Sequence, residues 1–211
     1  DTIDQVIKLS PDRVALFNYA HIPSMFLPQT RIKEDDMPSA SEKLDILQMS
    51  VNKLTDTGYI FIGMDHFARA DDDLAIALAN GTLQRNFQGY STFADTNMLS
   101  FGVSSIGFIG NTYYQNVKDT DSYYRSLDNN QLPILRGFIL DDDDILRRYI
   151  ISQIMCQFRL DYLAVARKFK IDFMTYFAME IDKISSLEGL GLLNVSKSGF
   201  EVSAKGRFLI R

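Results

Sequence analysis

The stretch Gly58–Arg69, GYIFIGMDHFAR, decides how this chain folds. It opens on a glycine, the usual residue just past the end of a helix. Tyr59–Ile62 then form an uninterrupted apolar run, which predicts a strand covered on both faces, as in a parallel sheet. Ligands of α/β proteins bind beyond the carboxyl ends of such strands. We therefore take Asp65, His66 and Arg69 as functional candidates, although they could instead cap a helix or pair with one another.

A second strand is predicted upstream, over Val14–Tyr19, and it is also followed by a polar cluster that contains His21. Between the two strands, a helix is predicted from Ser39 or Ser41 to the glycine at position 58, with serine and glutamate in capping positions. A strand, a helix and a strand form a βαβ unit, whose strands run parallel. His21 and His66 should therefore share one sheet edge and one pocket.

Composition limits the classes of function. The chain has 211 residues with 22 Lys and Arg against 27 Asp and Glu, a net charge of −5, which argues against a broad nucleic-acid-binding surface. Cys156 is the only cysteine, so an internal disulfide is excluded and a reducing, cytoplasmic location is expected. No apolar run is long enough to span a membrane. The first residues resemble the end of an amphipathic helix, so we expect the chain to be part of a longer protein.

The middle of the chain is less regular. Asp71–Asp73 predict the start of a short helix, because carboxylates are favoured at a helix N-terminus. Residues 82–111 mix aromatic, glycine and amide side chains without a period, which is typical of a functional loop. Within it, Arg85 and its polar neighbours would suit a carboxylate-bearing ligand; the alternative is a surface loop with a structural arginine. Val103–Ile109 predict a strand of small residues.

The character of the sequence changes near Asn129, where a turn-rich link predicts a domain boundary and divides the chain into residues 1–128 and 129–211. Beyond it, Asp141–Asp144 open a strongly amphipathic helix. More helical segments follow, and two short strands flank Lys197–Gly199. Helices followed by a hairpin predict a winged-helix-like module.

Several blocks, taken together and in this order, resemble one family. They are FNYAHIPSMF (Phe17–Phe26), KLDIL (Lys43–Leu47), GYIFIGMDHFAR (Gly58–Arg69), RNFQGYST (Arg85–Thr92), FGVSSIGFIG (Phe101–Gly110), DDDILRRYIISQIMCQF (Asp142–Phe158) and AKGRFLIR (Ala204–Arg211). The chain resembles the C-terminal half of the oxygen-independent coproporphyrinogen III oxidases, which are radical S-adenosylmethionine enzymes. The resemblance implies an α/β fold: the last part of an incomplete parallel (β/α) barrel, followed by a mostly helical, winged-helix-like domain.

The same resemblance implies an oxidoreductase of heme biosynthesis. Its family decarboxylates two propionates of coproporphyrinogen III to vinyl groups, giving protoporphyrinogen IX, with a [4Fe-4S] cluster, S-adenosylmethionine and an unidentified electron acceptor. The family's cysteine triad, C-x3-C-x2-C, is absent from this chain. We therefore expect the chain alone to bind no cluster and no other metal, and to be inactive.

Site residues follow from two sources. The resemblance implies contacts to S-adenosylmethionine from Ala20, Ile106 and Gln88. The residue patterns give the candidates for the substrate pocket, where four propionates need cationic or donor partners: Arg85, His21, His66, Asp65 and Arg69.

Three other interpretations remain open at this point. A heme-handling relative would share much of the architecture. A metal-dependent barrel hydrolase could use His21, His66 and Asp65 as an open metal site. A DNA-binding regulator could use the winged module, although acidic residues interrupt its basic ones. We favour the oxidase over all three.

Overall fold

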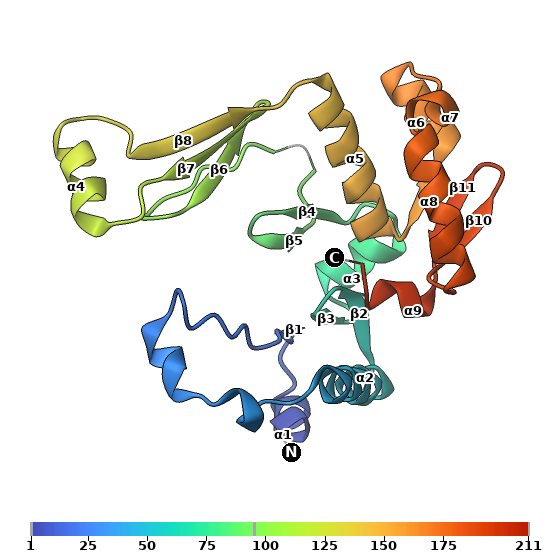
Figure 1. Cartoon of the computed structure of the whole chain (residues 1–211), viewed down its shortest axis with the longest axis horizontal. Helices are drawn as coiled ribbons and strands as arrows, with labels where there is room; N and C mark the ends of the chain where they lie inside the picture. Colours follow the sequence, from blue (N-terminus) through green and yellow to red (C-terminus); the bar gives the residue numbers. More distant parts are fainter. Residues whose placement is uncertain (1, 95, 211) are drawn as a thin grey trace. The chain divides into compact units, whose positions relative to one another are not determined.

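Figure 1 shows the computed structural model, which describes residues 2–94 and 96–210. The chain combines helices with several small sheets. It divides into two compact units, which we call the N-terminal unit, up to Asn80, and the C-terminal unit, from Gly81. Each unit has its own sheets and its own buried residues.

The N-terminal unit is built on one three-stranded sheet. Its core joins Ile3 of the first helix to Leu54 of the long helix and to Ile62 and Phe67 of the sheet, all buried. The elements are α1 (Thr2–Leu9), β1 (Arg13–Ala15), the 3-10 turns η1 (Leu27–Arg31) and η2 (Glu34–Asp36), α2 (Ala40–Asp56), β2 (Tyr59–Gly63), β3 (His66–Arg69) and α3 (Asp73–Ala79).

The strand order in this sheet is β1-β3-β2. Both outer strands run antiparallel to β3, so β1 and β2 are parallel to each other within one sheet, as predicted. The intervening strand was not predicted. The first strand is also shorter than expected, because it ends at Ala15 rather than Tyr19. The chain then leaves the sheet, and the Phe17 side chain is 69% exposed.

The sequence predicts that the Tyr59–Ile62 strand is covered on both faces, but in the structure it is only partly covered. Tyr59 and Ile62 are buried, but Ile60 is 38% exposed. After the strand, Gly63 and Met64 both take positive φ, and the chain folds back as a hairpin into β3. An antiparallel sheet of this kind can leave one face open.

The two helices flanking β2 and β3 begin where the sequence predicts. Ser39 and Glu42 form a reciprocal capping box at the start of α2, and Gly58, at φ +93°, follows its end. Asp72 caps α3 and lies 2.8 Å from the Arg13 Nε. Burial disfavours the Asp72 carboxylate, but the hydrogen bonds from Arg13 and from the helix backbone outweigh it and lower the Asp72 pKa.

The C-terminal unit contains a hairpin, two three-stranded sheets and most of the helices. Its elements are β4 (Gln84–Asn86), β5 (Gly89–Ser91), β6 (Ile106–Ile109), β7 (Thr112–Asn116), α4 (Thr120–Asp128), β8 (Ile134–Ile139), α5 (Asp142–Gln157), β9 (Arg159–Asp161), α6 (Tyr162–Phe169), α7 (Phe173–Tyr176), α8 (Ala178–Gly189), β10 (Leu193–Ser196), β11 (Gly199–Val202) and α9 (Ala204–Arg207).

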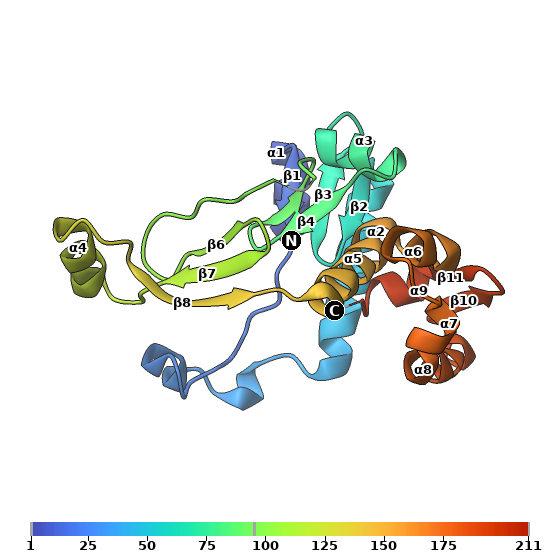
Figure 2. The ribbon, with the colours of Figure 1, turned by 90° about the horizontal axis from the view of Figure 1, so that it is seen from above.

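The sheet β6-β7-β8 is an antiparallel meander with α4 beyond one end, as Figure 2 shows. Its last two strands pair on either side of residue 129, with Tyr113 opposite Phe138. The turn-rich link predicted there therefore includes a strand, and the compact units divide after Asn80 instead. The boundary at 128/129 concerns the domains of a larger protein and stays a prediction.

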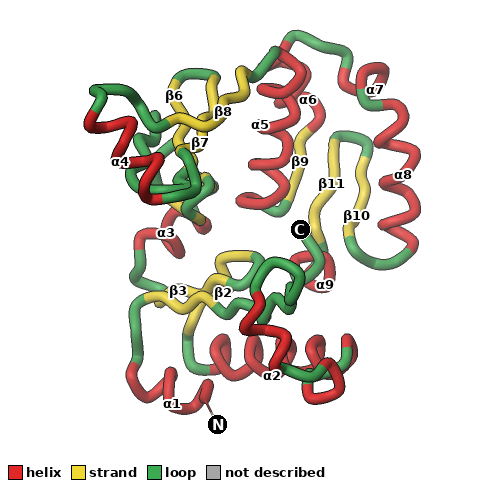
Figure 3. The backbone as a smooth tube through the Cα atoms, turned by 60° about the vertical axis from the view of Figure 1, so that its left-hand side comes forward, coloured by secondary structure: helices red, strands yellow, loops and turns green. Residues whose placement is uncertain are grey.

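The second sheet has the order β10-β11-β9 and lies beside α6 and α8 (Figure 3). Beneath it, Tyr162 and Phe173 stack at 4.4 Å between ring centroids, and Val165 and Phe200 are buried with them. The predicted hairpin around Lys197–Gly199 is confirmed.

Helix α5 connects the two sheets. Asp141 accepts a hydrogen bond from the Asp144 N–H at 2.9 Å, and the Asp144 carboxylate accepts one from the Asp141 N–H at 3.2 Å. The predicted acidic start of this helix is thus a capping box. At the other end, Phe158 takes a left-handed conformation at φ 55°.

We expect Asp141→Ala to lower the free energy of unfolding by about 1 kcal/mol, because an N–H of the first turn of α5 loses its acceptor. Asp141→Asn keeps an acceptor and should cost clearly less. Urea unfolding of both variants measures the difference, and equal losses would show that the cap bond contributes nothing.

Two helical glycines should respond to alanine with opposite signs. A Cβ on Gly206 would lie 2.0 Å from the backbone oxygen of Leu192, so Gly206→Ala must displace main chain and should destabilise the protein by about 1–3 kcal/mol. Gly189 has nothing within 4 Å of that position, and Gly189→Ala should stabilise by about 0.4–1 kcal/mol. Urea midpoints that shift in the same direction for both would contradict this.

Candidate functional site

The C-terminal unit contains a cavity of about 630 Å³. It is lined by the β4 hairpin, the segment before β6, the β6–β7 sheet and the helices α5 and α6. Its volume lies within the range of sites for small molecules. Among the side chains that line it are Arg85, Phe108, Tyr113, Arg148 and Lys168.

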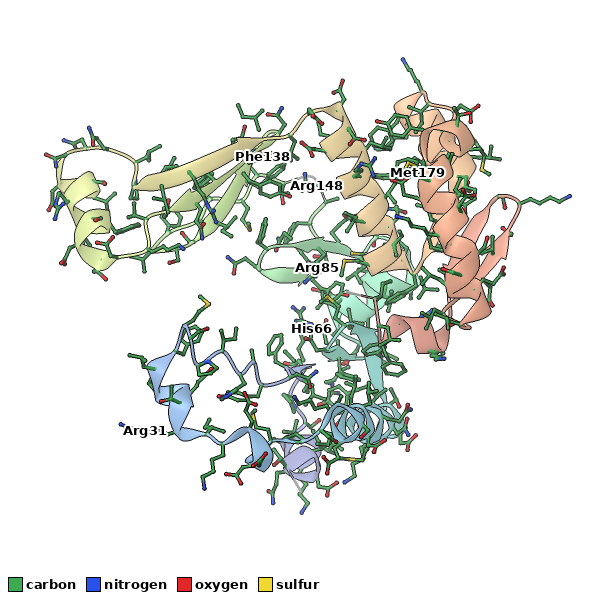
Figure 4. All side chains as sticks on the ribbon, in the orientation of Figure 1. Arg31, His66, Arg85, Phe138, Arg148 and Met179 are labelled. Atoms are coloured by element: carbon green, nitrogen blue, oxygen red, sulfur yellow. The ribbon has the colours of Figure 1, made fainter. Side chains whose placement is uncertain are left out.

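Helix α5 supplies one wall of the cavity. Its lining residues include Ile145, Arg148, Ser152 and Met155, which recur at the spacing of a single helix face. Figure 4 shows Arg148 and Arg85 along the side of α5 that faces the small strands. The opposite side of the helix is packed into the unit, since Leu146 and Cys156 are buried.

The Arg148 guanidinium lies on the aromatic wall. Its Cζ is 4.0 Å from the ring centroid of Phe108 and 5.6 Å from that of Tyr113. Such stacking attracts the cation to the ring faces and leaves the N–H edge of the guanidinium free to donate. A third aromatic ring, that of Phe87, lies edge-on to the Tyr113 ring, and the two ring centroids are 5.2 Å apart.

Two further cations line the same cavity. The Arg85 Cζ lies 5.8 Å from the Tyr90 ring centroid, and one of its nitrogens is 3.9 Å from the Met155 sulfur. The Lys168 Nζ lies 5.0 Å from the Tyr149 ring centroid. No carboxylate lines the cavity among the residues that the structure describes. The site can therefore accept an anion that also carries apolar or flat groups.

The N-terminal unit brings two of the predicted residues together. The His66 Nδ1 lies 2.8 Å from the Asp65 Oδ1, and Asp65 is only 4% exposed. The Phe17 ring packs edge-on against the imidazole, with the centroids 5.8 Å apart. A carboxylate on Nδ1 fixes the orientation of an imidazole ring. This pair sits where β1 and β2 end, since His66 is paired with Ala15 and with Gly63.

The other two candidates in that unit make local contacts. The His21 Nδ1 lies 3.3 Å from the Tyr19 hydroxyl in the irregular segment after β1. Arg69 donates to the Ser10 hydroxyl at 3.2 Å and to the Asp71 carboxylate at 3.3 Å. These contacts favour a structural role for Arg69.

The residues implied to contact S-adenosylmethionine are spread over the chain. Ala20, in the N-terminal unit, uses its carbonyl to accept a hydrogen bond from the Gln29 side chain at 3.0 Å. In the C-terminal unit, Ile106 is half-buried at the start of β6, and Gln88 is exposed in the β4–β5 turn. None of the three lines the cavity described above. Their roles stay predictions.

Cys156 is fully buried, and burial raises its pKa to about 11, although the Ser152 hydrogen bond and the charge of Arg85 act in the opposite direction. Its thiol is therefore protonated near neutral pH and packs as a small core residue. Over residues 2–94 and 96–210, no group of three His, Cys, Asp or Glu side chains is arranged to hold a metal ion. The same ranges contain no helix that is both long and apolar enough to cross a membrane.

Arg148 and Lys168 line the cavity and are functional candidates that the sequence analysis did not single out. The adjacent arginines Arg147 and Arg148 are a sequence feature that could have drawn attention to Arg148. Adjacent residues on a helix point about 100° apart, so two neighbouring arginines meet different surroundings. Arg147 pairs with Asp143 and Glu180, at 2.8 and 2.9 Å, and Arg148 faces the cavity.

Comparison with known proteins gives consistent results. Residues 140–209 match the family described as the HemN C-terminal domain. The oxygen-independent coproporphyrinogen III oxidases of Salmonella typhimurium and Escherichia coli are 49% and 47% identical to the chain over 210 residues, which is 100% of this chain and 46% of each relative. The chain thus spans about half the length of these curated relatives.

A solved structure agrees with the sequences. It is coproporphyrinogen III oxidase (HemN) from Escherichia coli, described as a radical SAM enzyme, with a TM-score of 0.95 and 47% sequence identity. The match covers all of this chain and 48% of the other. The resemblance that the sequence motifs carry is therefore confirmed: the chain is similar along its whole length to part of the oxygen-independent coproporphyrinogen III oxidases.

Proposed function

We propose that the complete protein containing this chain is an oxygen-independent coproporphyrinogen III oxidase, an oxidoreductase of heme biosynthesis. The observation that carries this proposal is the likeness over every part of the chain, at 47–49% identity and a TM-score of 0.95. One fold can host many functions, so fold alone would not suffice. Here the motif blocks themselves, including GMDHFAR and RNFQGYST, fall in the candidate sites.

The substrate is coproporphyrinogen III, and the reaction removes carbon dioxide from two propionates to leave vinyl groups. Bound S-adenosylmethionine and a [4Fe-4S] cluster supply the radical chemistry, and an acceptor that we do not identify takes the electron. The residues of this chain do not fit the cluster, because such clusters are held by several thiolates and Cys156 is a single buried thiol. We assign the cluster ligands to another part of the complete protein.

In the finer description of the fold, residues 1–128 are the last part of a radical S-adenosylmethionine barrel and residues 129–211 a winged-helix-like domain. The parallel direction of β1 and β2 supports the first part. The succession of α6, α7 and α8 followed by the β10–β11 hairpin supports the second. The antiparallel strand β3 is a departure from a simple parallel barrel.

The sites divide by chemistry. Ala20, Ile106 and Gln88 contact S-adenosylmethionine. Arg85, which lines the cationic cavity of the C-terminal unit, is a candidate for substrate contact, and the paired Asp65 and His66 are candidates within the N-terminal unit. His21 and Arg69 remain weaker pocket candidates, because Tyr19, Ser10 and Asp71 already occupy their polar groups.

The composition indicates the cellular location and the class of partner. We place the protein in the cytoplasm, because the one cysteine of this chain is free and buried. The net charge of −5 argues against a nucleic-acid partner.

The complete protein, purified and reconstituted without oxygen, should convert coproporphyrinogen III to protoporphyrinogen IX when S-adenosylmethionine and a reductant are present. Product masses lower by two carbon dioxide and four hydrogen atoms measure this, and omission of S-adenosylmethionine is the control. A protein that binds heme but leaves both propionates intact would instead be a heme-handling relative.

Substitutions in the complete protein should separate the two ligands. Arg85→Ala removes a charge-assisted hydrogen bond, so the affinity for the porphyrinogen should fall by about 1.5–3 kcal/mol, roughly tenfold to hundredfold, and Arg85→Lys should recover only part. Ile106→Ala should weaken S-adenosylmethionine binding by about 1 kcal/mol and spare the porphyrinogen. If Arg85→Ala weakens both ligands equally, or neither, Arg85 is a structural arginine.

A further inference from the structure

Two adjacent arginines of α5 differ in their partners. Arg147 forms ion pairs with Asp143 at 2.8 Å and with Glu180 at 2.9 Å. Arg148 forms no ion pair with a carboxylate in the part of the chain that the structure describes; its guanidinium lies over Phe108 and beside Tyr113. A cation that lines a cavity without an anionic partner is available to a ligand.

The charge of the cavity has the opposite sign to that of the whole chain. The chain carries −5, yet its cavity is lined by Arg85, Arg148 and Lys168 and, within the described ranges, by no carboxylate. Cations gathered in a concave site concentrate the local field. The cavity therefore selects an anionic ligand, and more than one carboxylate can be met at once.

The remaining walls combine apolar and aromatic side chains with the polar Gln84, Asn86, Thr96, Ser152 and Gln153, and they are partly open to solvent. Phe87 and Phe93 line the cavity and are 60% and 72% exposed, and Met98 and Tyr113 lie among the other lining residues. Exposed aromatic rings beside a cavity mark a surface for an apolar body, and flat rings pack well on them. The ligand that fits has a large apolar body with carboxylates at its edge.

We propose that this cavity binds propionate carboxylates of the tetracarboxylate macrocycle, with Arg148 as a specificity-determining contact. This inference rests on the proposed function, which supplies a substrate with four propionates. It goes beyond that function because it assigns substrate recognition to helix α5 and to the aromatic platform formed by Phe108 and Tyr113.

The platform explains why an arginine suits this position. Stacking on Phe108 holds the guanidinium plane before the ligand arrives, so less side-chain freedom is lost on binding. The N–H edge then offers two parallel donors to one carboxylate. Lysine would keep the charge but would offer neither the planar stack nor the fork.

The test uses the complete protein and coproporphyrin III, the oxidised, fluorescent form of the macrocycle, which keeps all four propionates. Fluorescence titration measures its affinity for the wild type and for Arg148→Ala, Arg148→Lys and Arg147→Ala. Arg148→Ala should weaken binding about tenfold to hundredfold, and Arg148→Lys should recover part of it. Arg147→Ala is the matched control, one residue away and outside the cavity lining, and should leave the affinity unchanged.

Coproporphyrin tetramethyl ester has the same ring without the charges, so it should bind weakly and equally to the wild type and to Arg148→Ala. Added salt should weaken the binding of the free acid more in the wild type than in Arg148→Ala. If Arg148→Ala does not fold, Lys168→Ala decides, because loss of that second lining cation should also weaken the free acid and spare the ester.

The outcomes separate this inference from the proposed function. If the protein decarboxylates coproporphyrinogen III but Arg148→Ala binds coproporphyrin III as tightly as the wild type, or the ester binds as tightly as the acid, the cavity assignment is overturned. If decarboxylation fails while Arg148→Ala still weakens the free acid alone, the reaction is wrong and the cavity stands as a site for a tetracarboxylate macrocycle.

Discussion

Helix α5 is fixed at both ends by hydrogen bonds to other elements, and the C-terminal unit depends on this helix for its arrangement. Before its first turn, the Leu140 N–H donates to the Asn111 carbonyl at 2.8 Å, and the Asn111 side-chain amide donates to the Leu140 carbonyl at 3.2 Å. After its last turn, the Phe158 carbonyl accepts from the Val202 N–H at 2.7 Å, and the Gln157 amide donates to a carbonyl just before β4 at 2.9 Å. Backbone groups buried away from water need such partners, so these bonds hold the β6–β7 turn, β11 and the β4 hairpin to one helix.

Because α5 is fixed at both ends, its faces have distinct roles. One face buries Leu146 and Cys156, another carries the ion pairs of Arg147, and a third lines the cavity. The Arg147 hydrogen bonds lower the pKa of Asp143 and of Glu180, and the Tyr176 hydroxyl adds to the effect on Asp143. Carboxylates with lowered pKa contribute stability above their unfolded pKa, and the contribution is lost as the pH falls through the folded value. Near neutral pH these pairs are therefore intact, and they satisfy Arg147 without involving Arg148.

The sequence predicts elements well where a local signal exists. The capping residues Ser39, Asp72 and Asp141 each begin a helix in the structure, and Gly58 follows the end of one. The parallel direction of β1 and β2 is also confirmed. What escaped prediction was β3, because a strand of four residues that starts at His66 has no long period and depends on the positive φ of two preceding turn residues. The candidate site residues show the same contrast. Asp65 and His66 are adjacent in sequence, so their pairing could be predicted. The cavity brings together residues between 84 and 169 through tertiary packing, which no local sequence pattern encodes.

The charge of this chain illustrates why a summed quantity can mislead about a site. A net charge of −5 argues against a broad nucleic-acid surface, but by the same reasoning it would argue against any ligand with several carboxylates. Coulomb interactions weaken with distance and with screening, so the charges within a few ångströms of a ligand dominate over those spread across the surface. The cations that line the cavity are held near the aromatic rings of Tyr90, Phe108 and Tyr149, and those rings attract a cation without neutralising it. A carboxylate partner would have cancelled the local field, as the partners of Arg147 do. An acidic protein can therefore keep an anion site by replacing carboxylates with aromatic rings around the cations that must stay available.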